Sequence, residues 1–304
     1  MYHYVRDLRR SPYPAIKGLE LDRFRAQVRF LRENYTPVSM ASVARAARGK
    51  ESLPERAVLL TFDDGYAEHY ENCFPILRDE GISGAFFAPV APVRDRVLLD
   101  VNRVHFVLSV RDAGEIATEI DRLVDANRHL FDLLPIADYR SKWAHPTRFD
   151  HSNTIYVKRM LQVALPEPLR NKIAKELFAR FVGVDEDVFA DELYCSVDQL
   201  RLMQNSGMYV GSHGCTHVWL DAVDEDQQAC EIEGSLSFLR SIGSPVDDYW
   251  AIAYPYGAWN SSLLNVLRRN RCTLGFTTEP AIADLGARDA LRLPRMDTND
   301  IPIN

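Results

Sequence analysis

Residues 57–66 read AVLLTFDDGY, and this stretch decides the fold class of the 304-residue chain. Its first four residues are a short apolar run, which is typical of a buried strand. Apolar residues at helical spacing follow over residues 70–77, and Gly81 can end that helix. The sequence therefore predicts a strand that passes into a helix at two adjacent carboxylates, Asp63 and Asp64.

The same succession of an apolar run and an amphipathic helix recurs along the chain. An N-terminal helix is expected with Asp22 as its cap, and Ser196 with Gln199 forms a capping-box pattern ahead of a later helix. Asn260 can cap another helix. Further strands are predicted over residues 84–90, 208–212, 250–254 and 273–277. Alternation of this kind predicts a parallel sheet, and in a chain of this length a (β/α) barrel.

Residues 101–194 interrupt this alternation of strands and helices. They carry little strand signal but at least two helical patterns, one with Ile116, Ile120 and Leu123 and the other over residues 169–181. We interpret this region as a helical insertion within a single domain of residues 1–304. A separate helical domain is the alternative.

Composition limits the partners and the compartment. A formal net charge of −7 argues against nucleic acid or an anionic membrane as the partner. No window approaches the length of a membrane span, and charges within the first twenty residues leave no room for the apolar core of a signal peptide. The five cysteines are odd in number and scattered, which suits reduced thiols. We therefore expect a cytoplasmic protein.

Two motifs at predicted strand ends offer ligands for a metal. His213 and His217 are four residues apart after one strand, so they can share a face and chelate one ion. Asp63 and Asp64 follow another strand, and the carboxyl ends of parallel strands converge. One carboxylate can then bind a cation while the other accepts or donates protons. Taken singly, the motifs are as well explained by a helix cap and surface histidines.

A third motif, residues 253–257 with the sequence AYPYG, ends another predicted strand. Pro255 and Gly257 can fix a sharp turn that aims a backbone N–H into the site. An ordinary strand-to-helix turn is the alternative for this motif alone.

Together the three motifs resemble the polysaccharide deacetylase family (NodB homology domain, carbohydrate esterase family 4). That family carries T-F-D-D-G, then H-[ST]-x-x-H, then an R-x-P-Y-G-like turn, and this chain has counterparts in the same order. The resemblance covers residues 57–90 and 195–300. It implies a distorted (β/α) barrel with an active-site metal, Zn²⁺ or another divalent transition metal.

The resemblance also implies roles for particular residues. It makes Asp64, His213 and His217 the metal ligands and Asp63 the general base. The backbone N–H of Tyr256 would stabilise the oxyanion. The implied activity is metal-dependent hydrolysis of an N-acyl group, expected to be N-acetyl, on an amino sugar of a surface polysaccharide or its precursor. The expected partner is therefore a carbohydrate.

The chain departs from the family pattern at three places. Ala253 stands where many members have an arginine that orients the base. The last histidine of the chain is His217, so the late L-x-H motif that supplies the general acid is missing. The late D-x-x-D-W motif is reduced to Asp297 and Asp300, followed by Ile301.

Other residues are candidates for the missing roles. His3, in the opening MYHYV, is the preferred general acid, because this opening resembles the first strand of some bacterial members. His105 or solvent is the alternative acid, and His3 can also have no role. Arg295 can contact Asp63 in place of the missing arginine, or it can be an exposed residue near the C-terminus. His69 is interpreted as a surface residue.

Other activities fit the same residues. The fold could act on an O-acetyl ester, an N-formyl group or a non-sugar amide, because the same metal and base would serve each of them. A catalytically silent carbohydrate-binding module is a further alternative, motivated by the missing arginine and late histidine. The intact aspartates and histidines of the first two motifs count against it. The oligomeric state is left open.

Overall fold

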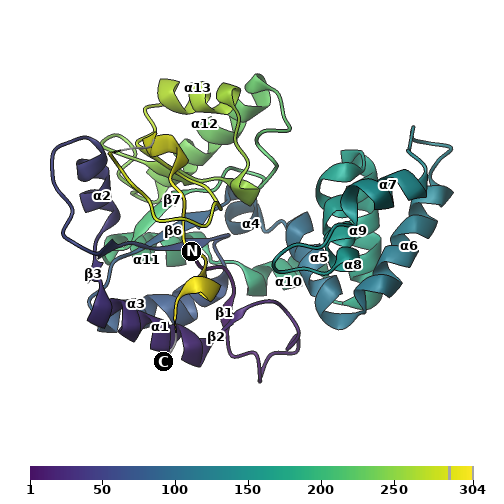
Figure 1. The fold of residues 1–304 in the computed structure, drawn as a ribbon, viewed down its shortest axis with the longest axis horizontal. Coiled ribbons are helices and arrows are strands. Elements are labelled where there is room, and N and C mark those ends of the chain that lie inside the picture. Colours follow the sequence, from purple (N-terminus) through teal and green to yellow (C-terminus); the bar gives the residue numbers. More distant parts are fainter. Residues whose placement is uncertain (287–288, 303–304) are drawn as a thin grey trace. The chain divides into compact units, whose positions relative to one another are not determined.

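The computed structural model describes residues 1–286 and 289–302, and the chain separates into two compact units. The first contains Met1–Asp7, Gly18–Val97 and the chain from Ala190 onward, and the second contains Leu8–Lys17 and Leu98–Phe189 (Figure 1). Within the described ranges, no helix has both the length and the apolar character needed to cross a membrane.

Five parallel strands form the central sheet of the first unit. Their order in the sheet is their order in the chain: β5 Leu60–Asp63, β6 Gly84–Ala88, β7 Tyr209–Ser212, β8 Ala251–Ala253 and β9 Leu274–Phe276. Every neighbouring pair is parallel, so each connection crosses over the sheet. The parallel sheet predicted from the alternation of strands and helices is confirmed.

Extended segments continue this sheet at both edges. Tyr2 pairs with Phe62 of β5, and Leu293 pairs beside β9. The Met1 nitrogen donates a hydrogen bond to the Met296 carbonyl oxygen (2.9 Å), so the segments at the two edges meet. The sheet is curled into a parallel half-barrel, which confirms the predicted α/β fold of the distorted (β/α) barrel kind.

Both faces of the sheet are apolar, as expected for parallel strands covered on both sides. Phe62 and Phe86 belong to one core cluster, while Phe87 and Tyr209, from alternate positions, belong to another. Residues paired across neighbouring strands share a face. Asp63 pairs with Phe87, so its side chain lies on the face of the second cluster.

Helices cover the sheet and are capped largely as the sequence predicts. α11 (Val197–Asn205) and α12 (Glu225–Ser241) pack against β7, and α13 (Ser261–Arg269) packs against α12. The capping box of Ser196 and Gln199 is present. The Asn260 side chain accepts a hydrogen bond from the Leu263 N–H (2.8 Å). Further helices of this unit are α1 Leu21–Asn34, α2 Met40–Ala47, α3 Phe74–Asp79 and α4 Val90–Asp95, with η1 His69–Cys73 before α3.

Several predicted boundaries differ from those in the structure, two of them for a clear physical reason. Helix α1 begins at Leu21 rather than after Asp22, because Glu20 is still paired in a short strand with Arg6. Asp22 lies instead in the first turn, where its negative charge interacts favourably with the positive end of the helix dipole. The strand predicted over residues 84–90 ends at Ala88, since the following proline has no N–H for the ladder. Short parallel pairs join β1 (Val5–Arg6) to β2 (Leu19–Glu20) and β3 (Thr36–Pro37) to β4 (Ala57–Val58).

The second unit is built from helices. They are α5 Asp100–Val110, α6 Ala113–Ala126, α7 Ile136–Trp143, α8 Ser152–Arg159 and α9 Glu167–Phe181, and α10 Glu186–Leu193 lies at the sequence boundary of the units. α6 and α9 correspond to the two predicted helical patterns. The ring of Tyr13 packs edge-on against Phe106 (4.9 Å between centroids), which ties residues 8–17 to this unit. The interpretation of residues 101–194 as an insertion within a single domain remains a prediction.

Replacing Phe86 with alanine should destabilise the first unit by about 3–5 kcal/mol, because it removes a buried ring from the middle of β6. The ring stacks on Phe62 with 4.6 Å between centroids. Urea unfolding followed by tryptophan fluorescence measures the change. Leu202→Ala, on the same unit but 45% exposed, is the control and should change the free energy of unfolding by less than about 0.5 kcal/mol. Equal effects of the two substitutions would contradict the assignment of the core.

Candidate metal centre

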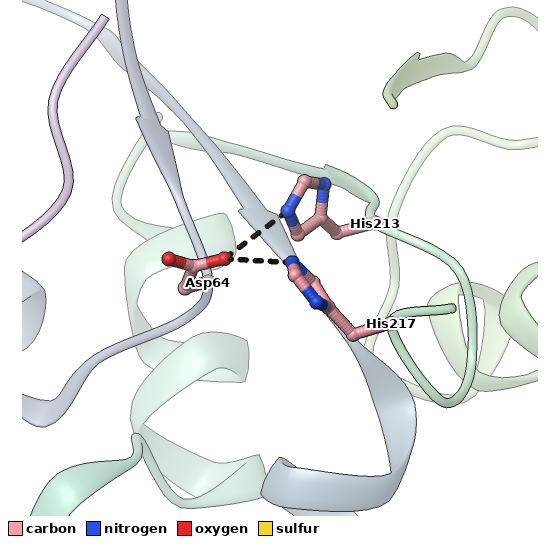
Figure 2. A group of neighbouring side chains, drawn as sticks. All are labelled: Asp64, His213 and His217. Carbon is pink, nitrogen blue, oxygen red and sulfur yellow. Dashed lines mark hydrogen bonds and ion pairs between the residues drawn. The ribbon is translucent and has the colours of Figure 1, made fainter. Parts of the chain in front are cut away.

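Three buried side chains from the ends of β5 and β7 meet in one cluster (Figure 2). Asp64 follows β5, His213 follows β7, and His217 lies four residues later. The Nε2 atom of each imidazole is 3.2 Å from the same oxygen, Oδ1 of Asp64. Figure 2 shows both rings turned toward this oxygen. The structure therefore brings together the three residues that the resemblance assigns to a metal.

The second nitrogen of His213 indicates which atom is available to an ion. Its Nδ1 lies 2.6 Å from the carbonyl oxygen of Ala253. A carbonyl oxygen only accepts, so Nδ1 carries the proton, and when the ring is neutral its Nε2 presents a lone pair. This lone pair faces a carboxylate oxygen of Asp64, which is also an acceptor. A cation between the two would satisfy both, and the Ala253 contact is the kind of outer support that metal-binding histidines use.

The spacing of the ligand atoms also fits a small cation. Ligands of a tetrahedral zinc ion are about 3.3 Å apart when each bond is about 2.0–2.1 Å. In this cluster the three candidate ligand atoms lie within 4.8 Å of one another. Two nitrogens and one carboxylate suit Zn²⁺ and its neighbouring divalent transition metals. The residues present therefore fit the expected group, and they leave ligand positions open for water or substrate.

Tyr66 supports the other oxygen of the carboxylate. Its hydroxyl donates a hydrogen bond to Oδ2 of Asp64 (2.8 Å), which leaves Oδ1 toward the imidazoles. The tyrosine ring is fully buried and stacks on Tyr4 with 4.2 Å between centroids. The role of Tyr66 was not predicted from the sequence, although this residue stands only two positions after Asp64.

The backbone around the cluster is held in an uncommon conformation. Asp64, His217 and Tyr256 have φ angles of 77°, 59° and 59°, in the left-handed region that favours glycine. Each such residue costs of the order of 1–3 kcal/mol, and strain of this kind gathers at functional sites. Gly65 follows with φ +66°, and a Cβ there would lie 2.8 Å from Cβ of Ala88. Only glycine satisfies both conditions at that position.

Arg295 binds the neighbouring carboxylate, Asp63. Its two terminal nitrogens donate to the two Asp63 oxygens at 2.8 and 2.6 Å, and both side chains are buried. The same guanidinium also donates to the Thr277 carbonyl oxygen (3.0 Å) and the Thr61 hydroxyl (3.2 Å). The structure thus places a bidentate arginine on the predicted base, in a chain that has Ala253 at the family's usual arginine position.

This arginine controls the charge of Asp63. Burial alone would raise the pKa of the carboxyl, but the charge and hydrogen bonds of Arg295 outweigh burial. With smaller contributions from His213 and His3, the pKa falls to about 2. Asp63 is therefore ionised at neutral pH and able to accept a proton.

His3 lies at the open side of the same carboxylate. Its Nε2 is 3.9 Å from Oδ2 of Asp63, and 42% of its side chain is exposed. Backbone hydrogen bonds hold its segment against β5: Tyr2 donates to the Thr61 carbonyl (2.8 Å), and Asp63 donates to the Tyr2 carbonyl (3.0 Å). His3 is therefore both near the predicted base and accessible to a ligand.

The surface position expected for His69 is wrong, because this side chain is 1% exposed. Its Nε2 donates a hydrogen bond to the carbonyl oxygen of His3 (2.8 Å), and its ring lies among Phe62, Tyr66 and Phe86. Burial lowers the pKa of this imidazole to about 4, so it is neutral at physiological pH. The polar sequence around His69 did not indicate this role, because the role depends on a contact with His3, which is 66 positions away in the chain.

Two aromatic rings lie beside the histidines. The ring of Tyr256 meets His217 edge-on with 4.8 Å between centroids, and Trp219 stacks on Tyr256 at 4.5 Å. Both aromatic side chains are only partly buried. They form an aromatic surface next to the candidate metal ligands. The alternative acid His105 lies in α5 of the helical unit, and its proposed role stays a prediction.

The chain matches a known protein family over two ranges. The profile of the family described as polysaccharide deacetylase matches residues 50–96 and 178–275. These ranges contain both aspartates, both clustered histidines and Tyr256. The unmatched residues between them are mostly those of the helical unit.

A curated relative matches over a short segment. The poly-β-1,6-N-acetyl-D-glucosamine N-deacetylase of Escherichia coli K12 is 56% identical over 55 residues. The match takes in 18% of this chain and 8% of the relative, so the chain spans only a small part of that protein's length.

Solved structures share the fold over nearly the whole chain. The deacetylase PplD of Streptococcus pyogenes, solved in complex with acetate, has a TM-score of 0.60 and 19% identity, covering 97% of this chain and 89% of its own. IcaB from Ammonifex degensii has a TM-score of 0.53 and 18% identity, with the same coverage. The BpsB deacetylase domain of Bordetella bronchiseptica has a TM-score of 0.53 and 16% identity, covering 97% and 94%.

Replacing Arg295 with methionine should cost about 3–5 kcal/mol at neutral pH, because it leaves Asp63 charged and buried without its partner. Without the arginine, burial raises the Asp63 pKa above its unfolded value of about 3.9. An acid whose folded pKa is raised loses stability as the pH rises from its unfolded pKa to its folded pKa. The gap in unfolding free energy between wild type and variant should therefore widen as the pH rises above about 4.

Urea unfolding at several pH values measures this gap. Arg292→Met is the matched control, because Arg292 is in the same segment with a side chain that is 44% exposed. Its effect should stay below about 1 kcal/mol. A gap for Arg295→Met that is small, or that does not change with pH, would contradict the buried ion pair.

Proposed function

Because the chain belongs to the polysaccharide deacetylase family, we propose that it is a metal-dependent hydrolase that removes an N-acetyl group from an amino sugar of a surface polysaccharide or its precursor. The observation that carries this proposal is the cluster of Asp64, His213 and His217 at the ends of β5 and β7. Beside it stands a second carboxylate, Asp63, that its arginine keeps ionised. A cation site next to a proton acceptor is what amide hydrolysis needs.

In this proposal Asp64, His213 and His217 hold the cation. When bound, a divalent transition metal supplies Lewis acidity, which makes water a better nucleophile near neutral pH and polarises a carbonyl. Tyr66 fixes the Asp64 carboxylate and Ala253 fixes the His213 ring through the hydrogen bonds described above. Two of the three ligands, Asp64 and His213, are thereby oriented before any substrate arrives.

Asp63 acts as the general base. It accepts a proton from the attacking water as the water oxygen bonds to the acyl carbon. Arg295 holds both carboxylate oxygens, so the base is fixed in position as well as in charge. The resulting oxyanion would accept a hydrogen bond from the backbone N–H of Tyr256, at the left-handed turn after β8.

His3 acts as the general acid. As the bond between the acyl carbon and nitrogen breaks, its imidazolium donates a proton to the leaving nitrogen, and the products are a free amine and a carboxylate. Its partial exposure and its position beside Asp63 support this role. His69 anchors the backbone of His3 through its carbonyl oxygen.

The substrate class is proposed from relatives and from the aromatic surface. One relative is named for N-deacetylation of poly-β-1,6-N-acetyl-D-glucosamine, and PplD was solved with acetate, the acid that an N-deacetylase would release. The rings of Trp219 and Tyr256 offer an apolar face beside the metal ligands, on which the face of a pyranose could stack. An N-acetylated hexosamine is therefore the proposed substrate.

The two adjacent aspartates should give opposite results when each is changed to asparagine. Asp63→Asn should keep one metal ion per chain but lose turnover, because only the proton acceptor is removed. Asp64→Asn should lose the metal, as should the double variant His213→Ala, His217→Ala, because these residues are the ligands. Metal analysis of purified protein and an assay of amine release measure the two properties.

Either of two outcomes would contradict this assignment. A wild-type protein that never binds Zn²⁺ would end the proposal of a metal-dependent hydrolase. An Asp63→Asn variant with wild-type turnover would remove Asp63 as the base.

Replacing His3 with alanine should slow amide hydrolysis by about 100- to 10,000-fold, the usual contribution of a general acid. Hydrolysis of 4-nitrophenyl acetate should change far less, because 4-nitrophenolate leaves without a proton. The ratio of the two rates separates loss of an acid from a disturbed site. His129→Ala, an exposed histidine of the helical unit, is the control and should leave both rates unchanged. A His3 variant that slows both substrates equally would contradict its role as the acid.

A further inference from the structure

A buried carboxylate outside the cluster contacts the loop that carries both histidines. Glu231 is on α12, is 5% exposed, and neither the family motifs nor the proposed mechanism uses it. The loop runs from His213 to His217 after β7. All of these residues belong to the first unit.

Three hydrogen bonds join Glu231 to the middle of this loop. Its Oε2 accepts from the backbone N–H groups of Cys215 (2.6 Å) and Thr216 (3.0 Å). Its Oε1 accepts from the Thr216 hydroxyl (2.5 Å). One side chain therefore satisfies three donors that lie between the two candidate ligands, and a carboxylate is a strong acceptor for backbone N–H groups.

The neighbouring residues of α12 are also fitted to the loop. Gly234 and Ser235 stand three and four positions after Glu231, so the three residues share one face of the helix. A Cβ at Gly234 would lie 2.6 Å from Sγ of Cys215, so the loop approaches where this side chain is missing. Ser235 Oγ is 2.8 Å from Oγ of Ser212, which precedes His213. A glycine inside a helix is less favourable than alanine, and here the close approach of the loop accounts for its presence.

The loop needs this support because its backbone is strained. Gly214 and His217 both have φ in the left-handed region, at +72° and +59°. For His217 this conformation is uncommon, and it persists only when neighbouring contacts enforce it. A Cβ at Gly214 would lie 2.9 Å from Oε2 of Glu231, so the carboxylate lies directly against the loop backbone.

We propose that Glu231 is a positioning residue for the metal centre: its three hydrogen bonds keep His217 in its left-handed conformation and both imidazoles directed at Asp64. This inference rests on the proposed metal site, and it adds a residue that lies outside the ligand set. If the hydrogen bonds are lost, the loop relaxes toward ordinary backbone angles. The two imidazoles then no longer present their nitrogens to one ion together.

The test measures binding of Co²⁺ to the full chain, by competition with a chelating indicator and by the visible absorption spectrum of the bound ion. Glu231→Ala should weaken binding by about 10- to 100-fold and change the spectrum, as loss of outer-shell support usually does. Glu233→Ala, at an exposed glutamate two positions later on α12, is the matched control and should bind as wild type does.

Glu231→Gln separates geometry from charge. Its amide oxygen can accept from the two backbone N–H groups, and its NH₂ group can donate to the Thr216 hydroxyl, so the same three contacts can form without a charge. We expect this variant to restore the Co²⁺ spectrum and most of the affinity. A glutamine variant as weak as the alanine variant would overturn the positioning role.

The remaining outcomes are also decisive. If wild type binds Co²⁺ and a folded Glu231→Ala variant, checked by circular dichroism, binds equally well, this inference fails while the proposed function stands. If wild type itself does not bind, the proposed function fails and the inference with it.

If Glu231→Ala does not fold, Thr216→Val decides, because it removes one of the three hydrogen bonds from an exposed residue. A severalfold loss of affinity in that variant supports the inference, and wild-type affinity overturns it.

Discussion

The paired hydrogen bonds between Arg295 and Asp63 connect the C-terminal segment of the half-barrel to its first strand, and the candidate site depends on them. Both charges are buried on the inner face of the sheet, so neither is tolerated without the other. The same arginine binds the Thr277 carbonyl just after β9, which joins three parts of the curled sheet at one point. The ion pair of Arg295 and Asp63 therefore both joins these parts of the fold and keeps the proposed base ionised. A pKa of about 2 makes Asp63 a weak base, so its contribution relies on position more than on basicity.

Around this pair, three residues in left-handed conformations complete the proposed site, and each lies next to a neighbour that contacts it or its loop. Tyr66 binds the carboxylate of Asp64, the face of α12 with Glu231 binds the loop that ends at His217, and Trp219 stacks on Tyr256. Such strain persists because the surroundings over-determine it. The site is thus built on the ends of rigid strands and fixed by contacts behind the reacting groups, which is how a constellation keeps its geometry before a substrate binds.

The fold was predictable because its signals are local. Apolar runs, caps such as Ser196 and Asn260, and motifs at strand ends fix the parallel sheet, and the ends of parallel strands must converge. The contact of Arg295 with Asp63 could be suggested because a missing arginine at position 253 leaves a buried base needing a cation. Glu231 and His69 were not predictable: their contacts join distant segments, and a single polar residue on a helix carries no periodic signal. The start of α1 was missed for the same reason, since pairing of β1 with β2 sets it.

The central claim is that the cluster of Asp64, His213 and His217 supports metal-dependent removal of an acetyl group from an amino sugar. The most direct measurement follows free amine released from β-1,6-linked N-acetylglucosamine oligomers by protein stripped with a chelator and then reloaded with Zn²⁺. We expect amine release by the reloaded protein and none by the stripped protein. The central claim is contradicted if protein with one Zn²⁺ per chain releases no amine from these or other N-acetylated oligosaccharides and sugar nucleotides, or if stripped protein is equally active.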